Sequence, residues 1–216
     1  MKGLLIKDIL NLKNYMKQLI LIFIFFTAYG IFLKNGIFVG AMITMMLSMQ
    51  VITTMSYDEY AKWDKYALTM NITRKDVVLS KYVFFVMCIL VGIVAGVVGS
   101  LAINSFAGVP LSIEEILVTS IIVPAIFSIL FCIVIPIVFK NGAEKARIIM
   151  MAVFFIPAIL VFLVAKIAEN SNIPMPDANT LDTLAKIGPI ALVVLAVVAC
   201  FVSYKISLKI YSKKEF

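Results

Sequence analysis

The chain has 216 residues, of which 63% are apolar and only 14% are charged, and its net charge is +7 at pH 7. A mean hydropathy of +1.09, together with long uncharged runs, excludes a soluble domain and predicts one membrane domain over residues 1–216. Histidine is absent, so the commonest general base and metal ligand is missing, and we expect no catalytic residue and no metal or cofactor site.

The first 18 residues predict a basic amphipathic helix. Leu5, Ile9, Leu12 and Met16 follow helical spacing as an apolar stripe, and lysines flank it. Such a helix lies in the plane of the lipid headgroups; alternatively, it extends the first span into the cytosol. The basic start followed by an apolar stretch resembles a secretory signal, but Lys34-Asn35-Gly36 stands where a small-residue cleavage site should be, so we expect no cleavage.

Six apolar runs follow, and each is expected to be a membrane-spanning helix. They are residues 19–33, 36–55, 83–103, 116–139, 148–165 and 187–204. Five of them have at least 18 residues, enough to cross about 30 Å of hydrocarbon. The first has only 15, so it needs flanking residues or a thinner bilayer. A re-entrant hairpin formed by the first two runs is the alternative.

The lysines and arginines predict which segments face the cytoplasm. Four of them precede the first span, five lie within 57–81, three within 140–147 and four after the last span, against three on the opposite side. Because short cytoplasmic segments are enriched in Lys and Arg, we expect both termini and these two segments to be cytoplasmic. Segments 104–115 and 166–186 would then lie outside.

Small residues and cysteines occur inside the predicted spans. Gly92, Gly96 and Gly99 line the third span, where they predict close helix packing within the chain or, alternatively, a dimer face. The cysteines are expected to be buried free thiols, because no CxxC spacing occurs. They are Cys88, Cys132 and Cys200.

None of the six runs contains Asp, Glu, Lys, Arg or His. Carriers driven by protons or sodium usually keep an ionisable group in the middle of the membrane, and an intramembrane enzyme needs an acid or a base. We therefore expect that any transport is driven from outside the bilayer. The chain also lacks a G-x-x-x-x-G-K-[ST] phosphate loop, so ATP would have to act through a separate polypeptide.

Residues 57–81 form a long polar interval that contains the only tryptophan. Read as one helix, Glu59, Trp63, Tyr66 and Met70 share a face. A hairpin between two spans needs far fewer residues, so we predict that a soluble partner docks here, with Trp63 as the anchor. The alternative is an ordinary solvated loop with a basic belt at the membrane surface.

The polar interval is predicted to turn a corner into a second helix. Thr73 and Asp76 have the spacing of a capping box for a helix that starts at Arg74, and Arg74 is expected to pin the corner. Lys81 and Tyr82 would mark where this helix meets the bilayer surface.

Residues 58–82 resemble the first cytoplasmic loop of bacterial type-2 ATP-binding-cassette (ABC) exporter permeases, in which an acidic residue and a tryptophan (Trp63 here) precede a corner, a basic residue and a Lys-Tyr pair. Residues 140–147 are similar to the second cytoplasmic turn of these permeases, and residues 1–8 to their interfacial start. The resemblance covers the whole chain. Asn71 departs from it, because proline is expected at this corner.

This resemblance implies an all-α permease subunit with six transmembrane helices, in a bacterial plasma membrane, that pairs with an identical or related chain and binds ATPase subunits. ATP and Mg²⁺ would bind to the ATPase and not to this chain, which would have no nucleic-acid partner. The coupling residues would be Glu59, Trp63, Tyr66, Met70 and Arg74, with a weaker contact at Glu144 and Lys145.

The cargo is suggested by a narrower similarity within the family. Short permeases from Gram-positive bacteria that export phenol-soluble modulins, which are amphipathic helical peptides, are similar to this chain. The similarity implies export of amphipathic peptides or lipid-like cargo by alternating access. The alternative is an accessory or sensor membrane protein that docks a soluble partner without transporting anything.

Overall fold

The computed structural model describes residues 2–13, 15–70, 72–107, 113–170 and 178–214, and these residues confirm the predicted all-α class. Asn71 at the predicted corner, and residues 108–112 and 171–177 of the two predicted outside loops, lie outside the described ranges. The described helices are α1 (Lys2–Lys13), α2 (Met16–Phe32), α3 (Gly36–Tyr60), α4 (Trp63–Thr69), α5 (Arg74–Ala107), α6 (Ile113–Asn141), α7 (Ala143–Asn170) and α8 (Ala178–Ser212).

Four of these helices, α3, α5, α6 and α8, are long and apolar enough to cross a membrane. The pair α1 and α2, bent by 68°, would supply a fifth if it forms one broken span, and a re-entrant loop is the other possibility for it. The described residues thus contain four or five candidate membrane spans, fewer than the six predicted. The run 148–165 lies in α7, which is 28 residues long, and its crossing of the membrane stays a prediction.

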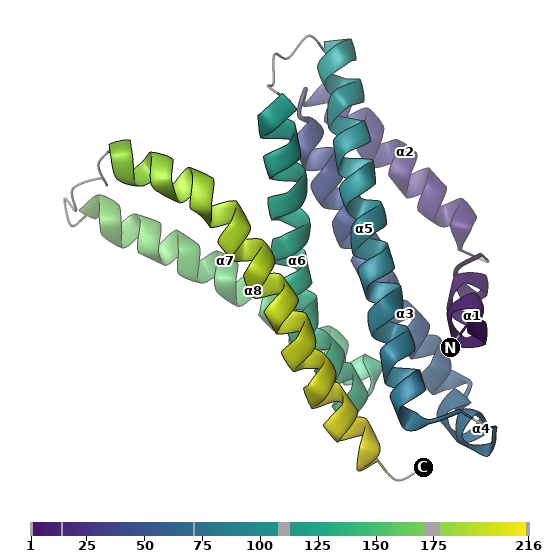
Figure 1. Ribbon diagram of the computed structural model, residues 1–216. Helices are drawn as coiled ribbons and strands as arrows, with labels where there is room; N and C mark the ends of the chain where they lie inside the picture. The colour runs from purple at the N-terminus through teal and green to yellow at the C-terminus, as the bar shows by residue number, and fades with distance from the viewer. Residues whose placement is uncertain (1, 14, 71, 108–112, 171–177, 215–216) are drawn as a thin grey trace.

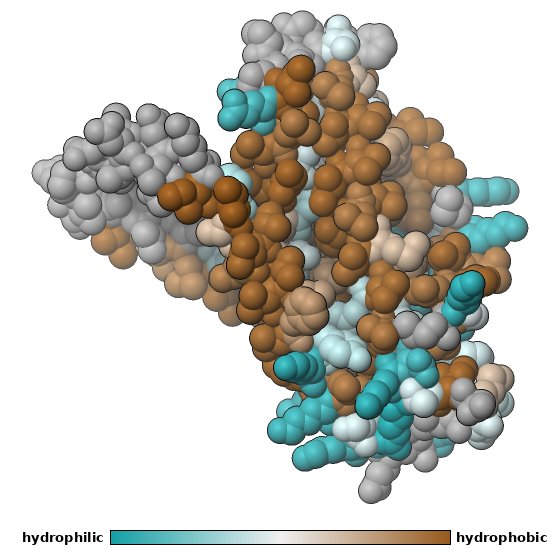
Figure 2. Space-filling model, in the orientation of Figure 1, coloured by the Kyte–Doolittle hydropathy of each residue, from teal (hydrophilic) through white to brown (hydrophobic). Residues whose placement is uncertain are grey.

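The helices are tilted and converge at one end of the molecule, which we call the polar end. There α1, α4, the start of α5, the turn between α6 and α7 and the end of α8 lie together (Figure 1). Figure 2 shows most of the hydrophilic residues of that face at or near this end, whereas apolar residues cover the long helices above it. Toward the opposite end α7 and α8 diverge from α5 and α6 (Figure 1).

The closest packing is between α3 and α5, and small residues make it possible. A Cβ atom on Gly40 would lie 2.9 Å from the Cα of Gly96, and one on Gly92 would lie 2.8 Å from the Oγ1 of Thr44. Larger side chains at these positions would force the two helices apart. The prediction that the glycines of this span pack within the chain is therefore confirmed.

The main hydrophobic core lies in the half of the bundle next to the polar end. It combines side chains of α3, α5, α6 and α8, among them Phe85 and Phe131, which are fully buried with their ring centroids 6.2 Å apart. Cys88 and Cys132 are buried and Cys200 is half-buried, and all three are free thiols, as predicted. The half of the described chain next to the polar end therefore holds most of the close interior packing.

The first helix differs from its predicted form. Ile9, assigned to the apolar stripe, is 47% exposed, whereas Asp8 is completely buried. Leu5 and Leu12 pack against the main core. The side of α1 that faces the bundle is thus centred on the carboxylate of Asp8, which pairs with the buried Lys81. The placement of α1 in a headgroup plane stays a prediction.

Candidate functional site

The polar interval does not form the single helix that the spacing predicts. The helix α3 continues to Tyr60, Lys62 then adopts a left-handed conformation with φ 50°, and α4 occupies only Trp63–Thr69. A residue with positive φ cannot continue a right-handed helix. The prediction of one helical face from Glu59 to Met70 is therefore wrong, because Glu59 belongs to α3 and the other three predicted docking residues follow the break.

The short helix α4 has an outer and an inner side. Tyr66 is 61% exposed and Met70, just past its end, is 52% exposed. On the inner side Ala67 is fully buried and Trp63 packs against the main core. The ammonium group of Lys7 lies 4.6 Å from the centroid of the Trp63 ring, within the range of a cation–π contact. Trp63 thus attaches α4 to the bundle, while Tyr66 and Met70 remain available to a partner.

Glu59 connects the end of α3 to the start of α7. One of its carboxylate oxygens accepts a hydrogen bond of 2.6 Å from the backbone N–H of Ala143, the first residue of α7. A negative group at a helix N-terminus satisfies a free N–H and interacts favourably with the helix dipole. Beside it, the Tyr60 hydroxyl donates a hydrogen bond of 3.2 Å to Glu144. The two segments predicted as separate docking elements are therefore in contact.

Gly142 permits this contact between α3 and α7. Its φ of +83° lies in the left-handed region, which favours glycine. A Cβ atom at this position would lie 2.3 Å from Oε1 of Glu59. Glycine is thus required here both by the backbone conformation and by the approach of the carboxylate.

A buried cluster of two lysines and two aspartates joins α1, α3 and α5. The ammonium nitrogen of Lys81 lies 2.7 Å from an oxygen of Asp8 and 2.7 Å from an oxygen of Asp58, and Lys7 also pairs with Asp58. The side chain of Lys81 is only 3% exposed and that of Asp8 is completely buried. Charges this deep persist only when they are paired. Lys81 thus lies inside the bundle, and its position relative to a bilayer surface stays a prediction.

Tyr82 is also buried in the bundle, and its position relative to a bilayer surface likewise stays a prediction. Its hydroxyl shares hydrogen bonds with the hydroxyls of Ser203 and Ser207 on α8, the latter at 2.8 Å. Ser203 in turn donates to the backbone carbonyl of Cys132 on α6. A buried hydroxyl needs such partners, and these bonds connect α5, α6 and α8 inside the bundle.

The predicted capping box is confirmed at the start of α5. The Thr73 hydroxyl donates to the Asp76 carboxylate at 2.6 Å, and the backbone N–H of Asp76 donates to the Thr73 hydroxyl at 3.2 Å. The guanidinium group of Arg74 donates to the backbone carbonyls of Tyr211, at 3.3 Å, and of Ser212. These carbonyls lie in the last turn of α8, where carbonyl groups have no N–H partner four residues further along the helix. Arg74 thus connects the corner to α8.

Asp64 makes a second connection between the polar interval and α8. The buried Tyr211 hydroxyl donates a hydrogen bond of 2.9 Å to its carboxylate. Burial raises the pKa of Asp64 above its usual 3.8, and the hydrogen bond from Tyr211 and the charge of Lys214 oppose this effect only in part. The helix α4 is therefore held by α8 as well as by α1.

The predicted coupling residues come from several elements, α3, α4, α5 and α7. Five of them are exposed, namely Glu59, Tyr66, Met70, Glu144 and Lys145, whereas Trp63 and Arg74 are half-buried. The pairing of Lys81 with Asp8 was not predicted from the sequence, although each of the two residues interrupts an otherwise apolar helix face. Within the described ranges, no group of three His, Cys, Asp or Glu side chains could hold a metal ion.

A family model described as "ABC-2 family transporter protein" matches residues 3–212. No curated protein and no solved structure matches the chain. The family match covers nearly the whole chain, and the long apolar helices agree with a multi-pass membrane protein. Members of this family are the membrane components of ABC transporters, in which a separate subunit is the ATPase. The chain therefore belongs to the ABC-2 family of transporter proteins and is a permease subunit.

Proposed function

We propose that this permease subunit works in an ATP-driven exporter of a bacterial plasma membrane and moves amphipathic peptides or lipid-like cargo out of the cytoplasm or the membrane. The ATPase subunit binds ATP and Mg²⁺, and this chain binds neither. The permease pairs with a second identical or related chain. Six membrane spans, with both termini and the polar end in the cytoplasm, belong to this proposal.

The attachment of α4 is the observation that carries the proposal. Its outer side offers Tyr66 and Met70, an aromatic and a flexible apolar side chain of the kind that anchors protein interfaces. Its inner side is bound to α1 through Trp63 and Lys7 and to α8 through Asp64. An ATPase that moves α4 would therefore move helices at both edges of the subunit.

Further contacts extend this path across the polar end. Glu59 binds the start of α7, and Lys81 joins α5 to the carboxylates of Asp8 and Asp58. Buried ion pairs and hydrogen bonds allow few alternative arrangements, which favours movement of the polar end as one body. Because the predicted spans contain no Asp, Glu, Lys, Arg or His, we expect the energy for alternating access to enter through this end.

The proposal is tested with the double variant Tyr66→Ala/Met70→Ala of the full chain, produced together with its ABC ATPase subunit. ATP-dependent uptake of a fluorescent amphipathic helical peptide into inside-out vesicles should be lost. Membrane insertion and the thermal midpoint should not change, because both side chains are more than half exposed. Trp63→Ala is a poorer test, because Trp63 packs against the core.

Phe32→Ala is the matched control, since Phe32 is an aromatic residue that is 82% exposed on α2. Vesicles with this variant should take up the peptide as well as vesicles with the wild type. Normal uptake by the double variant would contradict docking at α4. An ATPase whose turnover responds to the chain while no peptide moves would identify an accessory protein instead. Uphill movement by the chain alone with only an ion gradient would contradict the ATP-driven mechanism.

A further inference from the structure

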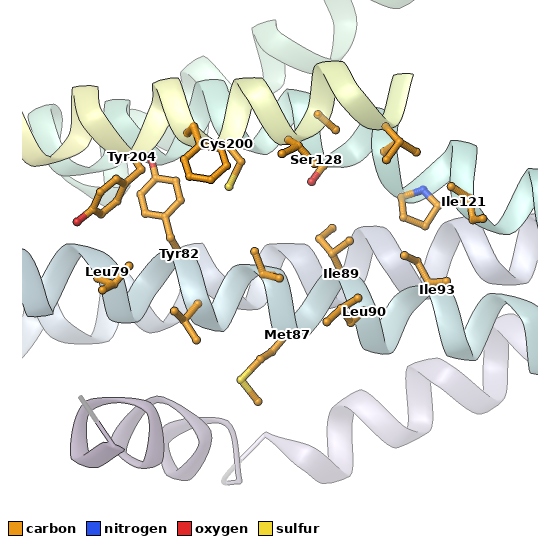
Figure 3. Close-up of a pocket in the computed structure, with 18 residues that line it drawn as sticks. Leu79, Tyr82, Met87, Ile89, Leu90, Ile93, Ile121, Ser128, Cys200 and Tyr204 are labelled. Carbon is orange, nitrogen blue, oxygen red and sulfur yellow. The ribbon is translucent and has the colours of Figure 1, made fainter. Parts of the chain in front are cut away.

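An open apolar groove runs between α5 and α8, with residues of α6 behind it (Figure 3). Its volume is about 620 Å³. Three of its lining residues, Leu90, Val197 and Phe201, are 57%, 51% and 67% exposed. The groove therefore opens sideways between the two helices, toward the lipid if the chain spans a membrane as proposed.

A basic depression lies at the polar end, between the same two helices α5 and α8. Lys75 of α5 and Lys205 and Lys209 of α8 line this depression and are exposed. Lys75 stands four residues before Leu79, and Lys205 four residues after Phe201, and both of these apolar residues line the groove. Residues four apart on a helix lie on one face about one turn apart. The lysines thus directly extend the apolar lining.

The charge at this end is positive on balance. Arg74 also lines the depression and adds a fourth positive charge while it binds the end of α8. Asp76, the acid beside Lys75, accepts hydrogen bonds from Thr73 as part of the capping box. The depression therefore suits an anionic group, and the groove next to it suits an apolar one.

The groove is long enough to hold an acyl chain through one leaflet of a bilayer. Its lining on α5 extends from Leu79 to Ile93, which is about 21 Å along the axis at a rise of about 1.5 Å per residue. One leaflet occupies roughly half of a hydrocarbon core of about 30 Å. A chain that starts at the lysines would therefore remain in the groove through its whole leaflet.

We propose that this groove binds one anionic phospholipid of the cytoplasmic leaflet, with its phosphate at Lys75, Lys205 and Lys209 and an acyl chain between α5 and α8. Clusters of basic residues at the membrane surface recognise anionic headgroups in this way. A second copy of the chain fits less well, because a two-fold contact centred on this groove would bring the lysines of α8 close to their own copies. The assignment to the cytoplasmic leaflet rests on the proposed orientation of the chain, whereas lipid binding itself is measured without cargo and without an ATPase.

Binding is measured on the full chain purified in mild detergent and mixed with equal amounts of dioleoylphosphatidylglycerol and dioleoylphosphatidylcholine. Native mass spectrometry then counts the lipids that remain bound. The wild type should retain phosphatidylglycerol preferentially. Lys205→Gln/Lys209→Gln should bind it about 25-fold more weakly, since each lysine near an anionic surface contributes roughly fivefold in affinity. Lys140→Gln/Lys145→Gln, which removes two exposed lysines from the turn between α6 and α7, should bind it like the wild type.

The acyl-chain half of the site is tested with two neighbouring tryptophan substitutions. Val197 lines the groove, and Val198 does not, although they are 51% and 55% exposed. Val197→Trp should displace the phospholipid, and Val198→Trp should not. Their thermal midpoints show whether both variants are folded.

Four results would overturn the proposal. The first is equal retention of the two lipids by the wild type, and the second is unchanged binding by Lys205→Gln/Lys209→Gln. The third is competition by soluble glycerol phosphate as strong as that by phosphatidylglycerol, which would leave the groove without a role. The fourth is dissociation of a dimer by Val197→Trp with lipid binding unchanged, which would make the groove a subunit interface.

Discussion

The carboxylate of Glu59 lies 2.6 Å from the backbone nitrogen of Ala143, so that a residue of α3 caps α7 from 84 positions away. The residue just before α7 is Gly142, which has no side chain to serve as a local cap. The start of α7 is thus stabilised only together with the end of α3. This arrangement makes the polar end one structural unit in spite of the break at Lys62.

Glu59→Ala should weaken the first turn of α7. Loss of a capping side chain costs about 1 kcal/mol, so we expect a lower thermal midpoint and faster amide hydrogen exchange at the start of α7. Glu59→Gln keeps an acceptor oxygen, so it should lose only the part of this stabilisation that depends on the negative charge. Exchange at the start of α7 that is the same in Glu59→Ala and the wild type would show that this contact does not stabilise the helix.

Gly142→Ala should destabilise the protein. The left-handed conformation costs an L-residue about 1–2 kcal/mol, and the new methyl group would also displace the Glu59 carboxylate. Gly188→Ala is the control, because Gly188 lies inside α8 with no atom within 4 Å of the added Cβ. Alanine there should be neutral or stabilising by up to about 1 kcal/mol. Equal thermal midpoints for the two variants would refute the proposed requirement for glycine at position 142.

Lys81→Met should lower the free energy of unfolding by about 3–5 kcal/mol, because it leaves two buried carboxylates without their shared partner. Adding Asp8→Asn to this variant should recover part of the loss, since it removes one of the uncompensated charges. Denaturation in detergent, followed by circular dichroism, measures both effects. Lys75→Met, an exposed change on the same helix, should stay within about 0.5 kcal/mol of the wild type. If Lys81→Met also changed the free energy of unfolding by no more than this amount, the cluster would contribute little to folding.

The stability of the protein should depend on pH through Asp64. Its pKa in the folded chain is raised above the usual value of 3.8, so the folded state holds this proton more tightly than the unfolded state. The resulting contribution to stability is complete below pH 3.8 and is lost as the pH rises through the raised folded value.

Asp64→Asn removes this titration and keeps an acceptor for the Tyr211 hydroxyl. The thermal midpoint of the variant minus that of the wild type should therefore increase as the pH is raised from 3.8 toward neutrality, and then level off. A difference that stays constant over this interval would show that the Asp64 carboxylate has the same pKa in the folded and unfolded states.

Predictions that depend on neighbouring residues agree well with the structure. The capping box of Thr73 and Asp76 acts across three positions, and each of the six apolar runs lies almost entirely within one helix. The resemblance to ABC exporter permeases agrees with the family match at the level of a permease subunit. The break at Lys62 was not predicted, because Lys has no side-chain feature that marks a left-handed conformation, unlike glycine or asparagine.

Composition and local spacing were enough to indicate an all-helical membrane chain, since hydropathy and helix capping act over a few consecutive residues. The partners of Lys81 and of Glu59 became apparent only from the folded chain. Asp8 is 73 positions from Lys81, and Ala143 is 84 positions from Glu59. Such pairs depend on which helices pack together, and a charged residue near an apolar run has the same local pattern whether it faces water or a buried carboxylate.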